Sequence, residues 1–146
     1  MNRGMSRLTK DRWLGGFHAW HHGKGGPHDA PVHLPDTLSA DGLAKWLDRF
    51  VPDAILYMGG EVPGLLKQLG IRTPDELGVV TLNRTPWEEF HAGVSENSDA
   101  VGAAAVDLLI AQIHRNERGL PENPYTVLVK GVWRPGSSVR NRTAAG

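Results

Sequence analysis

The sequence contains no cysteine, which excludes a disulfide framework and any chemistry based on a thiolate. It also has no excess charge of either sign, because sixteen Lys and Arg residues balance sixteen Asp and Glu residues. A domain that binds nucleic acid usually carries a basic surface, so the composition gives no reason to expect one. Two kinds of apolar run are missing as well: the roughly 18 residues that span a bilayer and the apolar core of a secretory signal. We therefore expect a soluble, cytoplasmic protein.

The chain has 146 residues, the size of one domain with room for one hydrophobic core. We expect a disordered or frayed N-terminus at residues 1–9, a folded unit at residues 10–138, and a flexible tail at residues 139–146. The stretch RPGSS, residues 134–138, is rich in Gly, Pro and Ser, so we expect the chain to begin fraying there.

Helical patterns occur in four stretches, where apolar residues recur at helical spacing. Ser39 is expected to cap the second helix, and Ser98 or Asn97 the fourth. Gly70 is expected to close the third helix. The predicted helices are residues 11–22, 40–51, 61–69 and 98–115.

Two near-continuous apolar runs, AILYM at 54–58 and GVVTL at 78–82, are typical of strands covered on both faces. A short strand at 32–35 and one or two strands within 125–133 complete the prediction. Because strands alternate with helices, we predict an α/β fold with an open, mainly parallel sheet and helices on both faces. Ligands bind at the carboxyl ends of such strands. The loops that leave Met58 and Leu82 are therefore the best candidate for a site.

The sequence lacks the familiar motifs of catalysis. Gly59-Gly60 is followed by no Lys-Ser or Lys-Thr pair at P-loop spacing, so we interpret it as a tight turn rather than a nucleotide site. His18, His21 and His22 share a helix face, which fits either a metal site or exposed histidines, and no HExxH glutamate accompanies them. No serine lies in a nucleophile elbow. We predict that the protein is not an enzyme and uses no metal and no cofactor.

Several segments, taken in order, carry a resemblance to a known family. They are DRWLGGFHAW (11–20), GIRTPDELGVV (70–80), AGVSEN (92–97), the helical stretch from Gly102 to Leu109, and RPGSS (134–138). Together they resemble the C-terminal part of the effector-binding domain of LacI/GalR-family transcriptional regulators. The sequence departs from the family at four places. Gly59-Gly60 replaces an Asn-Asp pair, and Asn83-Arg84 replaces an acidic pair. Trp13 stands where the family has an arginine, with Arg12 one place early, and the helix after Gly60 is shorter than usual and carries Pro63.

The resemblance implies one lobe of a periplasmic-binding-protein-like type I fold, in a homodimeric repressor that senses a small polar effector such as a sugar. Such an effector lies between two lobes, so this chain would supply one wall of the cleft, as a fragment or a natural truncation. DNA would be bound only through a headpiece that this sequence lacks. The residues expected to line the wall are Arg12, Trp13, Glu61, Asn83, Arg84, Trp87, Glu96 and Asn97.

The resemblance also places Val62, Leu65 and Leu66 in a dimer interface, as an exposed apolar face of the third helix. Glu61 and Glu96 are equally well interpreted as charges that favour the N-terminal end of a helix dipole. Other interpretations of the whole chain remain open. They are a lobe of a sugar-binding transport protein of the same fold, which needs an export signal, a truncated remnant that binds no DNA, and an enzyme with a flavodoxin-like sheet.

Overall fold

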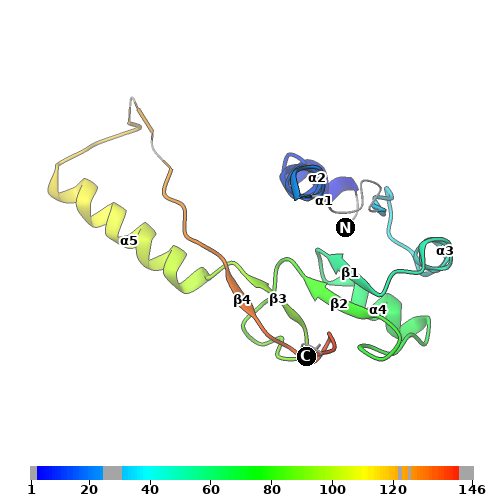
Figure 1. Cartoon of the computed structure of the whole chain (residues 1–146). Coiled ribbons are helices and arrows are strands. Elements are labelled where there is room, and N and C mark those ends of the chain that lie inside the picture. Colours follow the sequence, from blue (N-terminus) through cyan, green and yellow to red (C-terminus); the bar gives the residue numbers. More distant parts are fainter. Residues whose placement is uncertain (1–2, 25–30, 122, 125, 142–146) are drawn as a thin grey trace.

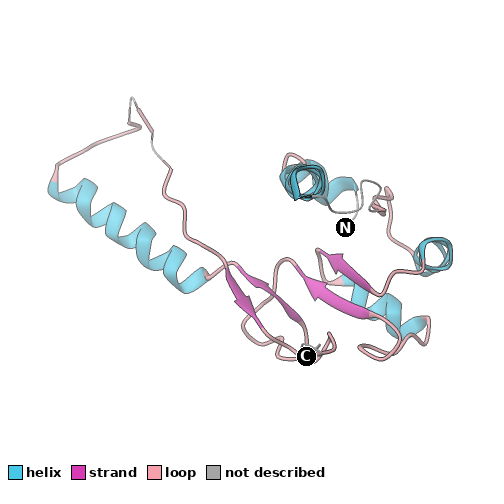
Figure 2. Ribbon diagram, in the orientation of Figure 1, coloured by secondary structure: helices cyan, strands magenta, loops and turns pink. Residues whose placement is uncertain are grey.

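The computed structural model describes residues 3–24, 31–121, 123–124 and 126–141. Within them the chain forms helices and a single sheet (Figures 1 and 2). In chain order the elements are α1 (Arg3–Leu8), α2 (Arg12–Lys24), α3 (Ala40–Phe50), β1 (Ala54–Tyr57), α4 (Glu61–Gln68), β2 (Gly78–Thr81), β3 (Ala92–Ser95), α5 (Ser98–His114) and β4 (Val132–Arg134).

The four strands form one open sheet in the order β1-β2-β3-β4. β1 is parallel to β2, with Ile55 opposite Val79, and β2 is parallel to β3. β4 runs antiparallel to β3, with Trp133 opposite Val94. The predicted class, an α/β fold with an open and mainly parallel sheet, is confirmed at this level.

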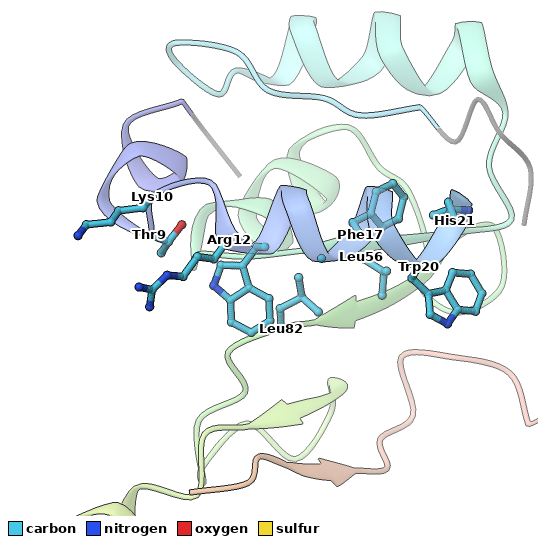
Figure 3. A pocket seen from close by; sticks show the side chains of 10 residues that line it. Thr9, Lys10, Arg12, Phe17, Trp20, His21, Leu56 and Leu82 are labelled. Carbon is cyan, nitrogen blue, oxygen red and sulfur yellow. The ribbon is translucent and has the colours of Figure 1, made fainter. Parts of the chain in front are cut away.

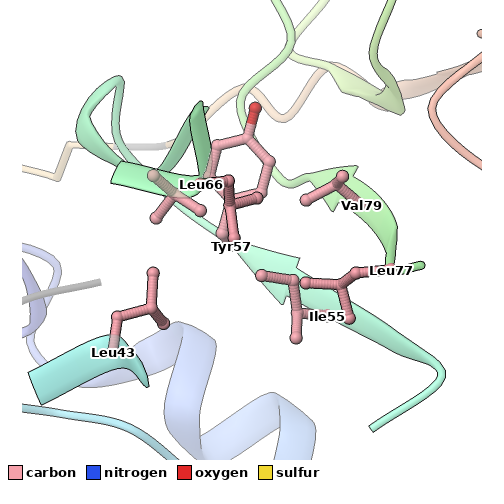
Figure 4. Packing of buried hydrophobic residues seen from close by; sticks show 7 residues of the cluster. Leu43, Ile55, Tyr57, Leu66, Leu77 and Val79 are labelled. Atoms are coloured by element: carbon pink, nitrogen blue, oxygen red, sulfur yellow. The ribbon is translucent and has the colours of Figure 1, made fainter. Parts of the chain in front are cut away.

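The hydrophobic core lies on one face of β1 and β2, where α3 and α4 pack (Figure 4). Side chains of a strand alternate between its two faces. Ile55 and Tyr57 accordingly point into the core, whereas Leu56 between them is 55% exposed on the opposite face. The core cluster consists of Leu43, Ile55, Tyr57, Val62, Leu66, Leu77 and Val79.

α3 and α4 are bounded by a side-chain cap and by two residues in left-handed conformations. The Ser39 side chain accepts a hydrogen bond from the Gly42 backbone N–H at 3.2 Å and caps α3. The chain leaves α3 at Val51, which takes a left-handed conformation with φ of 41°. Gly70, with φ of 71°, follows α4 as expected.

β3 is a strand that the sequence analysis did not predict. It pairs with β2 in only two registered positions, Val80 with Ala92 and Thr81 with Gly93. The connection from β2 to β3, residues 82–91, contains no helix. Parallel strands are usually joined through a helix. Because no helix precedes β3, the alternation of strands with helices that predicted β1 and β2 did not predict β3.

The ends of the chain also differ from the expectation. Residues 3–8 form α1 where a frayed start was expected, and residues 32–35 form no strand. β4 is shorter than the predicted stretch. RPGSS does not fray, since Ser138 is fully buried against the sheet. Of the predicted tail, residues 142–146 lie outside the described part of the chain.

α5 is the longest helix among the described residues and matches the predicted stretch closely. Asn97 occupies its N-cap position, although its side chain makes no capping hydrogen bond. The helix projects away from the sheet (Figure 1), and none of its residues is buried. Neither α5 nor any other helix in the described ranges is long and apolar enough to cross a membrane.

Candidate functional site

The loops that leave β1 and β2 meet at the carboxyl edge of the sheet. Because the two strands are parallel neighbours, their ends open on the same side, as the sequence predicted. The loops are also joined directly, since the Gly59 backbone N–H donates a hydrogen bond to the Asn83 side-chain oxygen at 3.2 Å. Gly59 has φ of 98°, a conformation that suits glycine. Gly59-Gly60 is therefore a turn that positions Asn83.

A short network of polar side chains lies behind Asn83. The Thr81 hydroxyl donates to the Asn83 side-chain oxygen at 3.2 Å and interacts with the Tyr57 hydroxyl. Burial raises the pKa of Tyr57, the hydrogen bond with Thr81 opposes this shift, and the charge of Glu88 adds to it. The Tyr57 phenol is thus a neutral group that helps to hold the end of β2.

The loop between β2 and β3 is folded on itself. The Arg84 guanidinium donates through Nε to the His91 backbone oxygen at 2.7 Å. The Glu88 carboxylate accepts from both the backbone and the hydroxyl of Thr85, at 3.1 and 3.0 Å. His91 packs edge-on against Tyr57, with ring centroids 6.0 Å apart. Arg84 therefore has a structural contact within its own loop.

A cavity of about 1050 Å³ lies between α2 and the face of the sheet opposite the core (Figure 3). Leu56 and Leu82 line its sheet side. The cationic side chains of Lys10 and Arg12 lie at one end, and the described residues that line the cavity include no Asp or Glu. The other lining residues are Thr9, Trp13, Gly16, Phe17, Trp20 and His21. This arrangement offers aromatic surface beside positive charge.

The structure brings together part of the predicted set. Arg12 and Trp13 line the cavity, and Asn83 follows Leu82, which lines it too. Asn83 itself lines neither this cavity nor the smaller one on α2, and the same holds for the other five predicted residues: Glu61, Arg84, Trp87, Glu96 and Asn97. Trp87 is 80% exposed, so nothing within the chain holds it over a ligand.

Three residues of α2 that line the cavity, Phe17, Trp20 and His21, were not among the predicted site residues. Phe17 and Trp20 follow Trp13 at intervals of four and three residues, so they lie on one face of the helix with it. That spacing was visible in the sequence. A stripe of aromatic residues on a helix is more often part of a core or an interface than a ligand site, so the spacing alone does not identify a cavity wall.

The prediction that α4 presents an exposed apolar face to a second copy is wrong. Val62 and Leu66 are each 3% exposed and belong to the hydrophobic core, and Leu65 is half-buried against it. The side chains that were expected to meet a second copy instead cover β1 and β2.

The histidines of α2 form no metal site in the structure. Phe17 packs against His21, with ring centroids 4.3 Å apart, and the rings of His18 and His22 are 6.5 Å apart. The described residues contain no group of three or more His, Asp or Glu side chains placed to hold a metal ion.

The chain was compared with protein-family models, with curated proteins and with solved structures. No match was found in any of the three comparisons.

Proposed function

We propose that the chain is the effector-sensing and dimerisation lobe of a LacI-like transcriptional regulator, with a periplasmic-binding-protein-like fold. Its effector would be a small polar molecule, a sugar or a sugar acid, bound between α2 and the carboxyl edge of β1 and β2. The observation that carries the proposal is the direct link between Gly59 and Asn83 beside the cavity lined by Arg12 and Trp13.

The chemistry of this edge suits a sugar ring. Trp13 offers an aromatic face for the apolar side of a ring, and the side-chain amide of Asn83 is a partner for a hydroxyl group. Lys10 and Arg12 supply positive charge, and no Asp or Glu is among the described residues that line the cavity, which favours a ligand that carries a carboxylate. A guanidinium binds a carboxylate through two parallel hydrogen bonds, so Arg12 would select a sugar acid over a neutral sugar.

In this proposal the effector acts by population shift. It binds better when a second lobe closes over the edge, and closure changes the placement of paired DNA-binding headpieces. A coupling of about 1–3 kcal/mol between effector and DNA is typical of such systems. A single wall makes fewer contacts than a closed cleft, so the chain alone should bind an effector weakly.

Binding can be tested with two sugars that share a ring, D-galactose and D-galacturonate. We expect D-galacturonate at millimolar concentration to shift the Trp13 indole signal and the Asn83 amide signals in NMR spectra, and D-galactose to shift them less. Trp13→Ala should weaken binding at least about tenfold, the equivalent of roughly 1.4 kcal/mol. Trp133→Ala is the matched control, because Trp133 lies on β4 and lines neither cavity. If neither sugar moves these signals, or if both variants behave alike, the proposed ligand class and site are wrong.

The dimerisation part of the proposal rests on α5 instead of α4. Val106, Leu109, Ile110 and Ile113 follow the spacing i, i+3, i+4, i+7 and so form one apolar stripe. Their exposed fractions are between 46% and 65% in the single chain. α5 has no Lys or Arg on any face, whereas a helix that binds a membrane surface is rich in them on its polar face.

We propose a second copy of the chain as the partner that covers this stripe. Two antiparallel copies of α5 bring Asp99, in the first turn of one helix, toward His114, in the last turn of the other. The zero net charge of the chain adds no repulsion between copies. A 17-residue helix is about 25 Å long and 10 Å wide, so the area available is less than the roughly 800 Å² per partner of a standard interface. We therefore expect a dimer that dissociates on dilution.

Sedimentation velocity across a range of concentrations tests the role of α5. The double substitution Leu109→Lys, Ile113→Lys should give a monomer where the parent chain dimerises, because four charges would meet in an apolar contact. Leu128→Lys is the control, since Leu128 is 89% exposed on the segment after α5. A parent chain that stays monomeric at high concentration, or a double variant that still dimerises, would contradict the assignment.

A further inference from the structure

α2 lies between two cavities. The outer one, of about 1050 Å³, separates it from the exposed face of β1, and a smaller one, of about 340 Å³, lies between α2 and α3. Trp13, Phe17 and His21 line both cavities, so these side chains of α2 border open space on two sides. Protein interiors are normally packed with few voids larger than a water molecule. A helix with space on two sides has room to move as a unit.

The apolar side chains on both sides of the outer cavity are only partly covered. Leu56, on β1, is 55% exposed although it faces α2 across this cavity, and Trp20, on α2, is 59% exposed. The rings of Phe17 and Trp20 pack on His21 of their own helix, with centroids 4.3 and 5.0 Å apart (Figure 3). Movement of α2 toward β1 would bury apolar surface on both elements, which is favourable.

The corner between α1 and α2 is a place where the chain can bend. Lys10 and Asp11 connect the two helices, and both have left-handed backbone conformations, with φ of 51° and 54°. Such conformations are uncommon and unfavourable for residues other than glycine. Strained residues of this kind cluster in ligand clamps and switch regions. A rotation that returns either residue to the right-handed region would change the direction of α2 relative to α1.

α1 is the fixed side of this corner. The Arg3 backbone N–H donates to the Pro35 oxygen at 2.8 Å, and the Arg3 guanidinium lies 3.5 Å from the Asp36 carboxylate. Ser6 has no exposed surface and is bonded twice to Asp11. Its backbone oxygen accepts from the Asp11 N–H at 2.9 Å, and its hydroxyl donates to the Asp11 carboxylate. These bonds hold the N-terminal end of α2, so a pivot would move the opposite end furthest.

The size of the outer cavity also favours closure. Sites for drug-sized molecules usually have volumes of about 300–1000 Å³, and a single sugar ring is smaller than such molecules. A sugar acid bound to Arg12 and Trp13 would therefore leave much of the 1050 Å³ to water. Closure of α2 would expel this water, and hydrogen bonds between Arg12 and a carboxylate are stronger where water is excluded.

We propose that α2 is a lid that pivots at Lys10 and Asp11 and closes over the outer cavity when the effector binds. Closure brings Phe17 and Trp20 toward Leu56. This inference rests on the proposed function, because the outer cavity is the effector site in that proposal. It adds a movement within this lobe to the closure of a second lobe. The effector shifts the population between two arrangements of α2 that the ligand-free chain already has.

Two spin labels can measure the position of α2. Because the chain contains no cysteine, the substitutions Ala19→Cys on α2 and Lys67→Cys on α4 create the only two labelled sites. Both residues are exposed and line neither cavity. α4 packs on the opposite face of β1, so closure shortens the distance between the labels. In pulsed electron paramagnetic resonance we expect two distances in the ligand-free chain, and D-galacturonate should increase the population with the shorter one.

Variants test the pivot without a ligand. Lys10→Gly should lower the population with the shorter distance about tenfold, because the left-handed conformation of the open state is unfavourable for lysine but not for glycine. Asn116→Gly is the matched control, since Asn116 is also left-handed, with φ of 54°, but follows α5. It should leave the distances unchanged. Leu56→Glu is a second test, because a charge beneath α2 should also oppose closure.

The results separate the lid from the sugar site. Two distances that respond to Lys10→Gly, but not to either sugar, would support the lid and contradict the proposed ligand class. NMR shifts caused by D-galacturonate without any change in the label distance would contradict the lid and leave the sugar site standing. A single distance that D-galacturonate, Lys10→Gly and Leu56→Glu all leave unaltered would overturn the lid.

Discussion

Replacing Ser138 with alanine should lower the free energy of unfolding by about 2–4 kcal/mol, because two buried backbone groups would lose their partner. The Ser138 hydroxyl donates to the Val79 backbone oxygen at 2.6 Å and accepts from the Ala92 backbone N–H at 2.8 Å. Both contacts are buried, and Ser138 itself has no exposed surface. Urea denaturation followed by circular dichroism measures the change.

The effect should be large because of where Ser138 lies. Its backbone oxygen also accepts from the Val79 N–H at 2.8 Å, and its N–H donates to the Phe90 oxygen at 3.0 Å. The residue therefore occupies the gap where β2 and β3 diverge, and it completes the hydrogen bonding of both chains.

Ser137→Ala is the matched control for this prediction, since the same change is made one residue away on an exposed side chain. Surface substitutions of this kind usually alter stability by less than about 0.5 kcal/mol. Equal stability of the two variants would show that the buried hydroxyl does not hold the strands together.

Gly93→Ala should be more damaging, with a loss of about 4 kcal/mol or more, or no folded protein at all. A Cβ atom at Gly93 would overlap the backbone oxygen of Thr81 and come within 2.6 Å of its side-chain methyl. Thr81 and Gly93 are one of the two registered pairs between β2 and β3. The methyl group would therefore separate the two strands at half of their contact.

Gly102→Ala provides the comparison, because nothing lies within 4 Å of a Cβ atom at that position in α5. Alanine in a helix interior is favoured over glycine by about 1 kcal/mol, so this variant should be at least as stable as the parent. Thermal denaturation distinguishes the two outcomes. A Gly93→Ala protein as stable as the Gly102→Ala protein would contradict the pairing of β2 with β3.

The elements with strong local signals were predicted well. β1 and β2 are apolar runs of strand length, and α3 carries its Ser39 cap and its apolar stripe within eleven residues. β3 was missed because its four residues, AGVS, are small and weakly apolar, so that pairing with β2 and β4 decides their conformation. Ser138 was missed for a related reason, since its partners lie 46 and 59 residues away in the sequence.

In the candidate site, too, the sequence predicted the position of the loops but not the positions of their side chains. Parallel neighbouring strands were enough to predict that the loops after Met58 and Leu82 meet, and Gly59 does contact Asn83. The contact that occupies Arg84 and the outward position of Trp87 depend on how residues 83–91 fold on themselves. No periodic pattern marks that loop, so its side chains could not be placed in advance.

The antiparallel pairing of β3 with β4 determines where the chain can change in length. Two antiparallel neighbours need no more than a tight two-residue turn between them, yet here residues 96–131, which include α5, separate them. In topological terms this long stretch is an insertion within a hairpin, with both of its ends anchored side by side. A change in the length of this stretch would leave the strand order unaltered, because both of its ends are held by the pairing of β3 with β4.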